Sequence, residues 1–238
     1  MKNELLPTSF QGINDDVYAG FMPRLGAYLL DILIMIPVIG LVMYLSNVSK
    51  SAYLSVSVAS LLITLVYHVV LVKIYGGTPG KLILKLKIIQ KNGDDIDWKG
   101  AFYRYSVEFL IAVLGVYVLM LTLNQIDDAT YVSLGFIKRS QTIALLNPLP
   151  NKIQSYLNYG WVIAGLIVLL TNARKRTTHD FIAGTVVVKS IYLETMRKVV
   201  NSTETSDSSV EYQVYQANKI IIKNKPHYLA KQGNVVCF

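Results

Sequence analysis

The ionisable residues that could do chemistry in this sequence lie inside or beside apolar stretches. Arg24 and Asp31 stand seven residues apart in the stretch RLGAYLLDILIMIP. On a helix this spacing is about two turns, or roughly 10 Å, so both side chains point the same way. A charge in hydrocarbon costs at least about 2.5–3.5 kcal/mol and usually faces other helices or a wet cavity. Asp31 could therefore bind a cation or a proton.

Further ionisable residues lie at a similar depth near later apolar stretches. His68 precedes Lys73 by five residues, and Asp180 lies in RKRTTHDFIAG. Glu108 follows Arg104 by four residues, a spacing that allows the two side chains to pair on a helix. We expect one polar cluster, at the cytoplasmic side of the membrane, made of Arg24, Asp31, His68, Arg104, Glu108 and Asp180.

Each of these residues also has a purely structural interpretation. Arg24 could anchor a helix end at the membrane interface, and Asp31 could fix helix packing by pairing with an arginine. His68 could be a hydrogen-bonded core residue, and Glu108 could be a solvated helix end. Asp180 could be the N-cap of a short helix that begins at FIAG.

The sequence lacks the common signatures of catalytic and metal sites. It contains no HExxH and no GxSxG, and its three histidines are dispersed. Cys237 is the only cysteine, which excludes a disulfide within the chain and a cysteine-based zinc site. We expect no catalytic residue, no metal site and no cofactor, and we do not expect an enzyme.

Composition and apolar runs predict an integral membrane protein. Of the 238 residues, 53% are hydrophobic and 16% are charged, against about 25% charged residues in an ordinary soluble domain. A helix that crosses hydrocarbon needs roughly 20 mostly apolar residues. We expect an all-α bundle of about four transmembrane helices, at about 25–46, 52–74, 105–123 and 156–173.

A small β element is expected beside the membrane. The segment LKLKII alternates apolar and basic residues with the period of a strand, and Asn92-Gly93 after it is a hairpin turn signal. Residues 185–188 form a second, β-branched run. We expect these pieces to pair as a cytoplasmic hairpin or sheet. An amphipathic segment whose lysines touch lipid headgroups is the alternative.

The distribution of basic residues predicts the orientation. The net charge is +8, and Lys and Arg concentrate between the second and third spans and after the fourth. Because short cytoplasmic loops carry the excess of Lys and Arg, we expect both termini and residues 75–103 in the cytoplasm. The expected partners are the lipid bilayer and its anionic headgroups rather than nucleic acid. Residues 1–17 would be a cytoplasmic segment, and residues 190–238 a weakly structured cytoplasmic tail.

Three stretches in order resemble the RDD family of bacterial membrane proteins, which is named for one arginine and two aspartates. YAGFMPRLGAYLLD matches the first two positions at Arg24 and Asp31, although Pro23 departs from the family pattern. GGTPGKLILKLKII resembles the family's segment after the second helix. RKRTTHDFIAGTVVV resembles its last signature and places the second aspartate at Asp180. The resemblance covers roughly residues 18–189 and is poor across 124–155.

The resemblance implies a multi-pass protein of the bacterial inner membrane, and two functions remain open. The first is a transporter or transport subunit, a candidate for cation/proton exchange, because such activity has been proposed for members of the family. The second is a non-catalytic scaffold or accessory subunit. The outer halves of the spans contain no ionisable residue, and four helices are few for a transporter. Transport would therefore call for a homo-oligomer or an unknown membrane partner.

Overall fold

The structure is a computed structural model and describes residues 6–8 and 16–198. The chain divides into two units, Met1–Leu193 and Glu194–Phe238, and the helices and strands named below all lie in the first. Most of the predicted N-terminal segment, the predicted tail from residue 199 onward and Cys237 lie outside the described residues.

Four helical stretches are long and apolar enough to cross a membrane, as predicted. They are α1 (Phe21–Val48), the composite second stretch (Lys50–Ile83), α5 (Trp98–Leu123) and α8 (Pro148–Thr171). The second stretch consists of α2 (Lys50–Leu65), the π-helix η1 (Val66–Val70), α3 (Leu71–Tyr75) and α4 (Pro79–Ile83). The prediction of an all-α membrane fold is confirmed. The fourth helix begins earlier than predicted because Pro148 starts it, and proline is favoured at the first helical position.

Side-chain caps fix where two of the spans begin. The Ser49 hydroxyl accepts a hydrogen bond from the Ala52 amide at 3.1 Å, and α2 follows. The Asp97 carboxylate accepts one from the Gly100 amide at 2.7 Å, and α5 follows. Each cap satisfies an amide that the first turn of a helix leaves without a partner.

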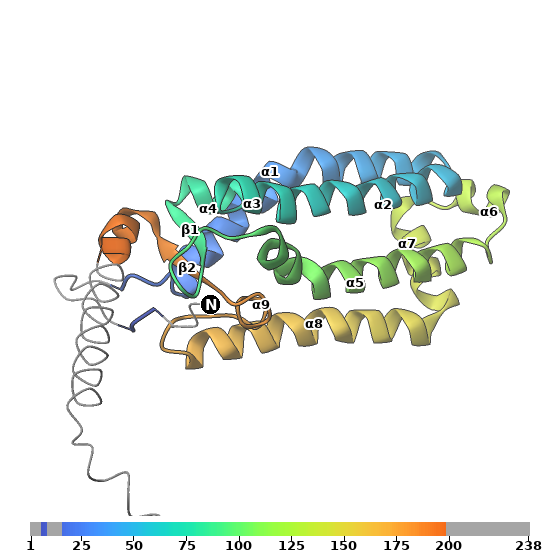
Figure 1. Cartoon of the computed structure of the whole chain (residues 1–238). Coiled ribbons are helices and arrows are strands. Elements are labelled where there is room, and N and C mark those ends of the chain that lie inside the picture. The colour runs from blue at the N-terminus through green and yellow to red at the C-terminus, as the bar shows by residue number, and fades with distance from the viewer. Residues whose placement is uncertain (1–5, 9–15, 199–238) are drawn as a thin grey trace, which may run out of the picture. The chain divides into compact units, whose positions relative to one another are not determined.

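The spans form an open row rather than a closed ring. Extensive contacts join α1 to α2, α2 to α5, and α5 to α8. Figure 1 shows the four helices in this order from top to bottom. No contact of comparable extent joins α1 to α8 in the described part of the chain. Both therefore lie at an edge of the row.

The helices α5 and α8 run antiparallel in a constant register. Near one end, the Asn147 amide donates to the Thr122 hydroxyl at 2.9 Å. Further along, the Trp161 indole donates to the Glu108 carboxylate at 3.1 Å. The two pairs fix which residues of α5 and α8 share a level in the membrane.

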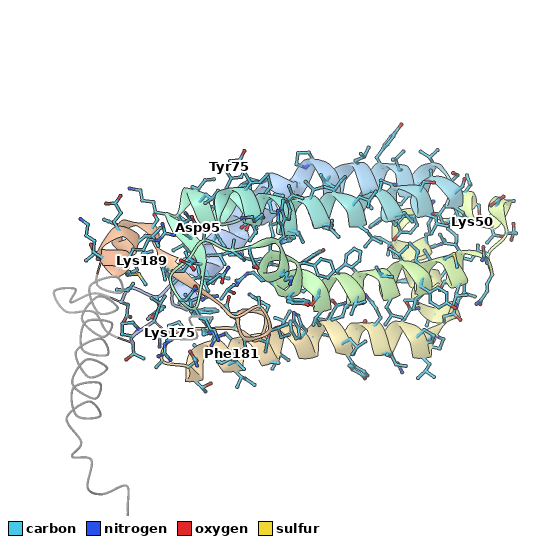
Figure 2. All side chains as sticks on the ribbon, viewed as in Figure 1. Lys50, Tyr75, Asp95, Lys175, Phe181 and Lys189 are labelled. Carbon is cyan, nitrogen blue, oxygen red and sulfur yellow. The ribbon has the colours of Figure 1, made fainter. Side chains whose placement is uncertain are left out.

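A two-stranded antiparallel sheet lies at one end of the spans. In it β1 (Leu86–Gln90) pairs with β2 (Thr185–Lys189), and Ile88 stands opposite Val187. The prediction of a small sheet is confirmed. Its strands come from segments about a hundred residues apart, so the pair is not a hairpin. Lys175 and Lys189 lie at this end of the spans, and Lys50 lies at the other (Figure 2).

The predicted turn at Asn92-Gly93 forms a short hairpin of its own. Gly93 has φ 93°, and the Gln90 amide donates to the Asp94 carbonyl at 2.9 Å. Beyond the turn, one isolated bridge joins Ile89 to Asp95. Asn-Gly is suited to this turn because it tolerates positive φ.

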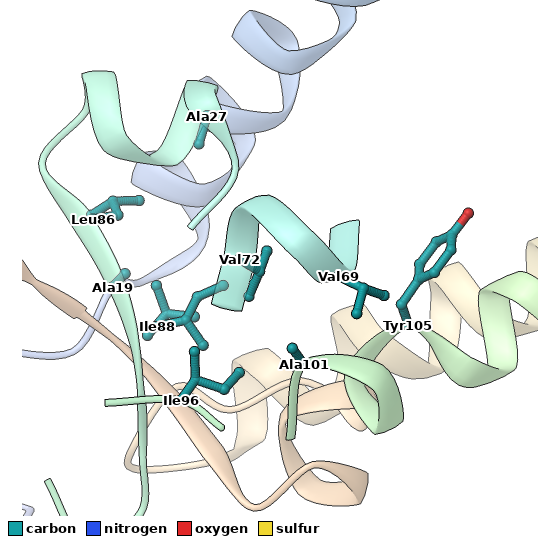
Figure 3. Packing of buried hydrophobic residues seen from close by; sticks show 10 residues of the cluster. Ala19, Ala27, Val69, Val72, Leu86, Ile88, Ile96, Ala101 and Tyr105 are labelled. Carbon is teal, nitrogen blue, oxygen red and sulfur yellow. The ribbon is translucent and has the colours of Figure 1, made fainter. Parts of the chain in front are cut away.

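The apolar core lies where the sheet meets the spans (Figure 3). Ile88 and Ile96 are fully or almost fully buried, and they pack with Val72 of α3 and Ala101 of α5. Figure 3 shows Val69 and Tyr105 extending this cluster along the helices. Ala27 of α1 belongs to the same cluster, so apolar contacts attach the sheet to three of the spans.

Helices also close the opposite end, between α5 and α8. Here α6 (Asp128–Ser133) and α7 (Phe136–Leu146) precede α8. The buried Arg139 guanidinium donates to the carbonyls of Ser46 (2.8 Å), Tyr131 (3.2 Å) and Leu134 (2.6 Å). Ser46 lies in the last turn of α1, where a cation complements the helix dipole.

The short helix α4 folds back along α1 and makes its closest approach at Gly80. A β-carbon on Gly80 would lie 2.3 Å from the Ala27 carbonyl oxygen and 2.7 Å from Asp31 Oδ1. Backbone atoms cannot yield at such distances, so only glycine fits here.

We expect Gly80→Ala to destabilise the protein by about 1–3 kcal/mol, because the added methyl group must push α4 away from α1. Gly40→Ala is the matched control, since a β-carbon on Gly40 in α1 would meet nothing within 4 Å. Thermal unfolding in detergent, followed by intrinsic fluorescence, measures both. Equal unfolding midpoints for the two variants would contradict the close packing of α4 on α1.

Candidate functional site

Asp180 forms ion pairs with two arginines from different spans. Arg24 of α1 donates from Nη1 to Asp180 Oδ2 at 2.8 Å, and Arg104 of α5 donates from Nη1 to Asp180 Oδ1. The Asp180 side chain is fully buried, and those of Arg24 and Arg104 are 10% and 6% exposed. One carboxylate thus joins the first and third spans.

Asp180 also organises the short helix that carries it, α9 (Thr178–Ile182). The amide and the hydroxyl of Thr177 each donate to Asp180 Oδ2 at 2.9 Å. Thr177 is the N-cap, and Asp180 is the third helical residue of a capping box. The alternative that Asp180 is itself the N-cap is therefore wrong: the helix begins earlier than FIAG because Thr177 takes that position.

The remaining donors of these arginines reach the backbone around Asp180. Arg24 donates to the carbonyls of Ala19 (2.9 Å) and Lys175 (2.6 Å). Arg104 Nη1 donates to the Thr185 hydroxyl at 2.7 Å, while Arg104 Nη2 is buried without a partner among the described residues. The cluster therefore ties α1, α5, α9 and β2 together.

Two opposing effects act on the pKa of Asp180. Burial alone would raise it, because the charged form loses its hydration. The positive charges of Arg104 and Arg24 outweigh burial and hold the pKa well below its usual value of 3.8. Asp180 therefore stays ionised, and its proton is not exchanged near neutral pH.

Asp31 lies in a separate arrangement and is not hydrogen-bonded to Arg24. Its carboxylate accepts hydrogen bonds from the Tyr67 hydroxyl (2.7 Å), the Thr78 hydroxyl (2.6 Å) and the Gly80 amide (2.7 Å). These donors come from η1, the turn before α4, and α4 itself. Asp31 thus fastens the end of the second span to α1.

His68 packs between two tyrosines. Its ring stacks on Tyr105 with centroids 4.8 Å apart, and it meets Tyr67 edge-on at 5.3 Å. It therefore lies on the interface between the second span and α5, in a core-like setting.

Glu108 has the least fixed carboxylate of the predicted cluster. It accepts a hydrogen bond from Trp161, and one oxygen lies 3.8 Å from His179 Nδ1. Arg104, four residues earlier, pairs with Asp180 instead of Glu108. The side chain of Glu108 is 37% exposed and that of His179 is 26% exposed, so both are accessible within the membrane-spanning part of the protein.

The short helix α9 brings His179 to this depth by folding back between α5 and α8. The Thr178 hydroxyl lies 3.5 Å from where a β-carbon on Gly165 would stand. Gly165 is six residues from the end of α8, or about 9 Å along the axis. Backbone that is not part of a span is tolerated at such depth where protein surrounds it.

The structure thus divides the predicted residues into three groups. Arg24, Arg104 and Asp180 form the first, Asp31 belongs to the second, and Glu108 belongs to the third. His68 lies beside the second and third groups without a hydrogen bond to either in the described chain. Sequence reasoning missed the partners Tyr67, Thr78, Thr177, Trp161 and His179. His179 had the clearest signal, because it directly precedes Asp180.

Metal coordination finds no support in the described residues. No group of three or more His, Cys, Asp or Glu side chains there could hold a metal ion.

We expect Asp180→Asn to destabilise the protein by about 3–5 kcal/mol, because it leaves two buried guanidinium groups without their counter-ion. Asp128→Asn is the control, since Asp128 pairs with Lys50 but is 86% exposed, and its loss should change stability by less than about 0.5 kcal/mol. Unfolding midpoints in detergent compare the two variants.

The pH dependence of the same comparison tests the ionisation of Asp180. A carboxyl whose pKa is lowered by folding stabilises fully above its unfolded value of 3.8. The stabilisation is lost as the pH falls through the lower folded pKa. The gap between wild type and Asp180→Asn should stay constant from pH 8 to pH 5 and narrow only below about pH 4. A gap that closes near pH 6 would mean that Asp180 titrates in the folded protein.

Comparison with known proteins agrees with the geometry. A sequence model described as the RDD family matches residues 18–184, a range that holds Arg24, Asp31 and Asp180. No curated protein and no solved structure gives a match to the chain. RDD proteins are membrane proteins, in agreement with the four apolar helices. The chain therefore belongs to the RDD family of membrane proteins.

Proposed function

We propose that this chain is a proton-coupled transporter, or the membrane subunit of one, in which Glu108 carries the proton. The observation that supports this most is the difference between Glu108 and the other two carboxylates of the site. Asp180 is held by two arginines and Asp31 by three hydrogen-bond donors. Glu108 accepts one hydrogen bond, from Trp161, and has no arginine or lysine within salt-bridge distance among the described residues.

The depth of Glu108 suits a group that gains and loses a proton. It is 10 residues from the start of α5 and 15 from its end, or about 15 and 22 Å along the axis. A bare carboxylate is unfavourable in hydrocarbon, so proton binding and release there change the free energy by several kcal/mol. His179 can receive or supply the proton, since its Nδ1 is 3.8 Å from Glu108 Oε1 and a small side-chain rotation would close that distance.

A monovalent cation exchanged for the proton is the transported species we propose. A cation that approached Glu108 would replace its proton as the neutralising charge, which couples the two movements. The expected role of Asp31 as the ion-binding carboxylate is not part of the proposal, because three donors already occupy its oxygens. No catalytic activity is proposed.

A non-catalytic scaffold or accessory subunit is the second candidate. The observation that favours it is the number of buried charges devoted to holding the fold, with Arg24, Arg104 and Asp180 engaged in one network and Arg139 in another. In that case Glu108 and Trp161 would only fix the contact between α5 and α8. The two candidates differ in whether ions move.

We expect Glu108→Gln to abolish cation-dependent proton movement while the protein remains folded. Glutamine keeps the size of the side chain and a hydrogen bond with Trp161, but it cannot carry a proton. Proteoliposomes with an internal pH-sensitive dye receive a pH gradient and then Na⁺, K⁺ or Li⁺ in turn. Wild type should dissipate the gradient at least tenfold faster than the variant.

Asp31→Asn is the matched control for this assay. It should lower thermal stability, because it weakens the attachment of α4 to α1, while the folded fraction keeps its ion movement. If neither wild type nor Glu108→Gln moves ions, and both are equally stable, the scaffold function replaces transport. If Asp31→Asn alone loses ion movement without loss of stability, the proton site is at Asp31.

We further propose that the protein lies in the cytoplasmic membrane of a bacterium with the sheet end inside. Basic residues gather at that end, including Lys175 and Lys189, and anionic lipid headgroups are their proposed partners (Figure 2). Both termini would then be cytoplasmic.

Cysteine labelling tests the orientation. In a Cys237→Ser background, Ser133→Cys in α6 should react with a membrane-impermeant maleimide in intact spheroplasts, because Ser133 is exposed at the end opposite the sheet. Lys99→Cys, exposed at the start of α5, should react only after lysis. The reverse pattern would invert the proposed topology.

A further inference from the structure

The edge helix α8 presents exposed polar side chains near the middle of its length. Tyr156 and Tyr159 are 71% and 68% exposed, and Asn158 between them is also exposed. Neither tyrosine hydroxyl has a hydrogen bond within the described residues. The Asn158 amide donates only to the Gln154 carbonyl of its own helix, at 3.2 Å.

These residues lie near the middle of the membrane. Tyr159 is 11 residues from the start of α8 and 12 from its end, or about 16 and 18 Å along the axis. The hydrocarbon layer is about 30 Å thick, so Tyr159 and Asn158 lie close to its midplane. Tyrosines that face lipid normally lie at the interface, where the hydroxyl reaches water. At mid-depth that hydroxyl has no water to bind.

The other edge of the row differs in this respect. The middle of α1 reads LIMIPVIG, residues 33–40, and contains no polar side chain. Its two exposed tyrosines, Tyr28 and Tyr44, lie seven residues from the start and four from the end of the helix, so both are nearer an interface than Tyr159 is. Lipid can cover the middle of α1 at no polar cost, whereas lipid on the middle of α8 would leave the hydroxyls of Tyr156 and Tyr159 without a hydrogen-bond partner.

We propose that the exposed face of α8 binds the α8 helix of a second copy of this chain. Tyr156, Tyr159, Gly160 and Ile163 recur at helical spacing, so they lie on one face. A β-carbon on Gly160 would meet nothing within 4 Å, which leaves room for a second backbone to approach. Small residues permit such close helix contacts in membranes, and polar side chains hydrogen-bond across them.

Self-complementarity is the reason for a second copy rather than another protein. A tyrosine hydroxyl both donates and accepts, so two identical pairs of tyrosines satisfy one another across a two-fold axis. Two α8 helices with the same orientation in the membrane can form this symmetric contact, and the contact uses the same face of both chains, so the assembly stops at a dimer. An α8-to-α1 contact would instead pair polar groups with an apolar surface and would extend into an open chain.

Cysteine cross-linking tests the interface. In a Cys237→Ser background, Ile163→Cys places a thiol on the proposed face, at a site that is 56% exposed. Ile36→Cys is the matched control, because Ile36 is 52% exposed at mid-depth on α1. Oxidation in isolated membranes and in dilute proteoliposomes should give a covalent dimer of Ile163→Cys and none of Ile36→Cys.

A second measurement follows the strength of the dimer. Tyr159→Phe removes one hydroxyl from each chain of the proposed dimer, and Tyr44→Phe removes one per chain from an equally exposed tyrosine (69%) on α1. Each hydrogen bond lost between membrane helices costs about 0.6–1.7 kcal/mol, which corresponds to a roughly three- to eighteen-fold weaker dimer. Energy transfer between labelled chains in liposomes of varying protein density should show this loss for Tyr159→Phe alone.

Three results would overturn the proposal. The first is monomers at every density by single-molecule photobleaching. The second is cross-linking of Ile36→Cys in place of Ile163→Cys, which would assign the contact to α1. The third is cross-linking of Ile163→Cys in native membranes to a product heavier or lighter than two chains, with none in purified proteoliposomes, which would assign α8 to another protein.

Discussion

The buried Asp180 carboxylate is the constraint on which the rest of this membrane protein depends. A single charge in such a site is strongly unfavourable, and its pairing with Arg24 and Arg104 makes it tolerable. Each arginine has more donors than one carboxylate can accept. Arg24 directs its other donors to backbone carbonyls, and Arg104 also donates to the Thr185 hydroxyl. The sheet, α9 and the ends of two spans nearest the sheet are thereby required to meet at one place.

Much of the fold could be predicted from the sequence, because hydrocarbon demands long apolar helices and strands alternate in polarity. Spans and sheet follow from such local patterns. The partners of Asp31 could not be predicted, because they depend on α4 folding back along α1, an event between distant segments. Arg24 and Asp31 share a helix face as expected, yet they serve different neighbours. Sequence spacing fixes direction on a helix, but tertiary packing decides what stands opposite.

The polar groups of the spans fall into two kinds, those with a full set of partners and those with fewer. The arginine and aspartates that give the family its name are saturated with partners, so they are suited to hold the architecture. Arg139 does the same at the other end, where it joins the end of α1 to α6. Glu108 and the polar middle of α8 are left with fewer partners than their chemistry requires. In a solvent without hydrogen-bond donors, incomplete pairing of this kind points to the places where a protein exchanges something or binds something.

The long separation between Arg24 and Asp180 also has a consequence for how the chain is made. They are 156 residues apart, which at 5–20 residues per second is roughly 8 to 30 s of synthesis. During that interval the first span waits in the membrane with its arginine unneutralised, and Arg104 joins it in the same condition. Only when α9 emerges do both acquire their counter-ion. Nascent chains of this protein therefore pass through a partly inserted state whose charges must be shielded by the insertion machinery, by lipid headgroups or by water.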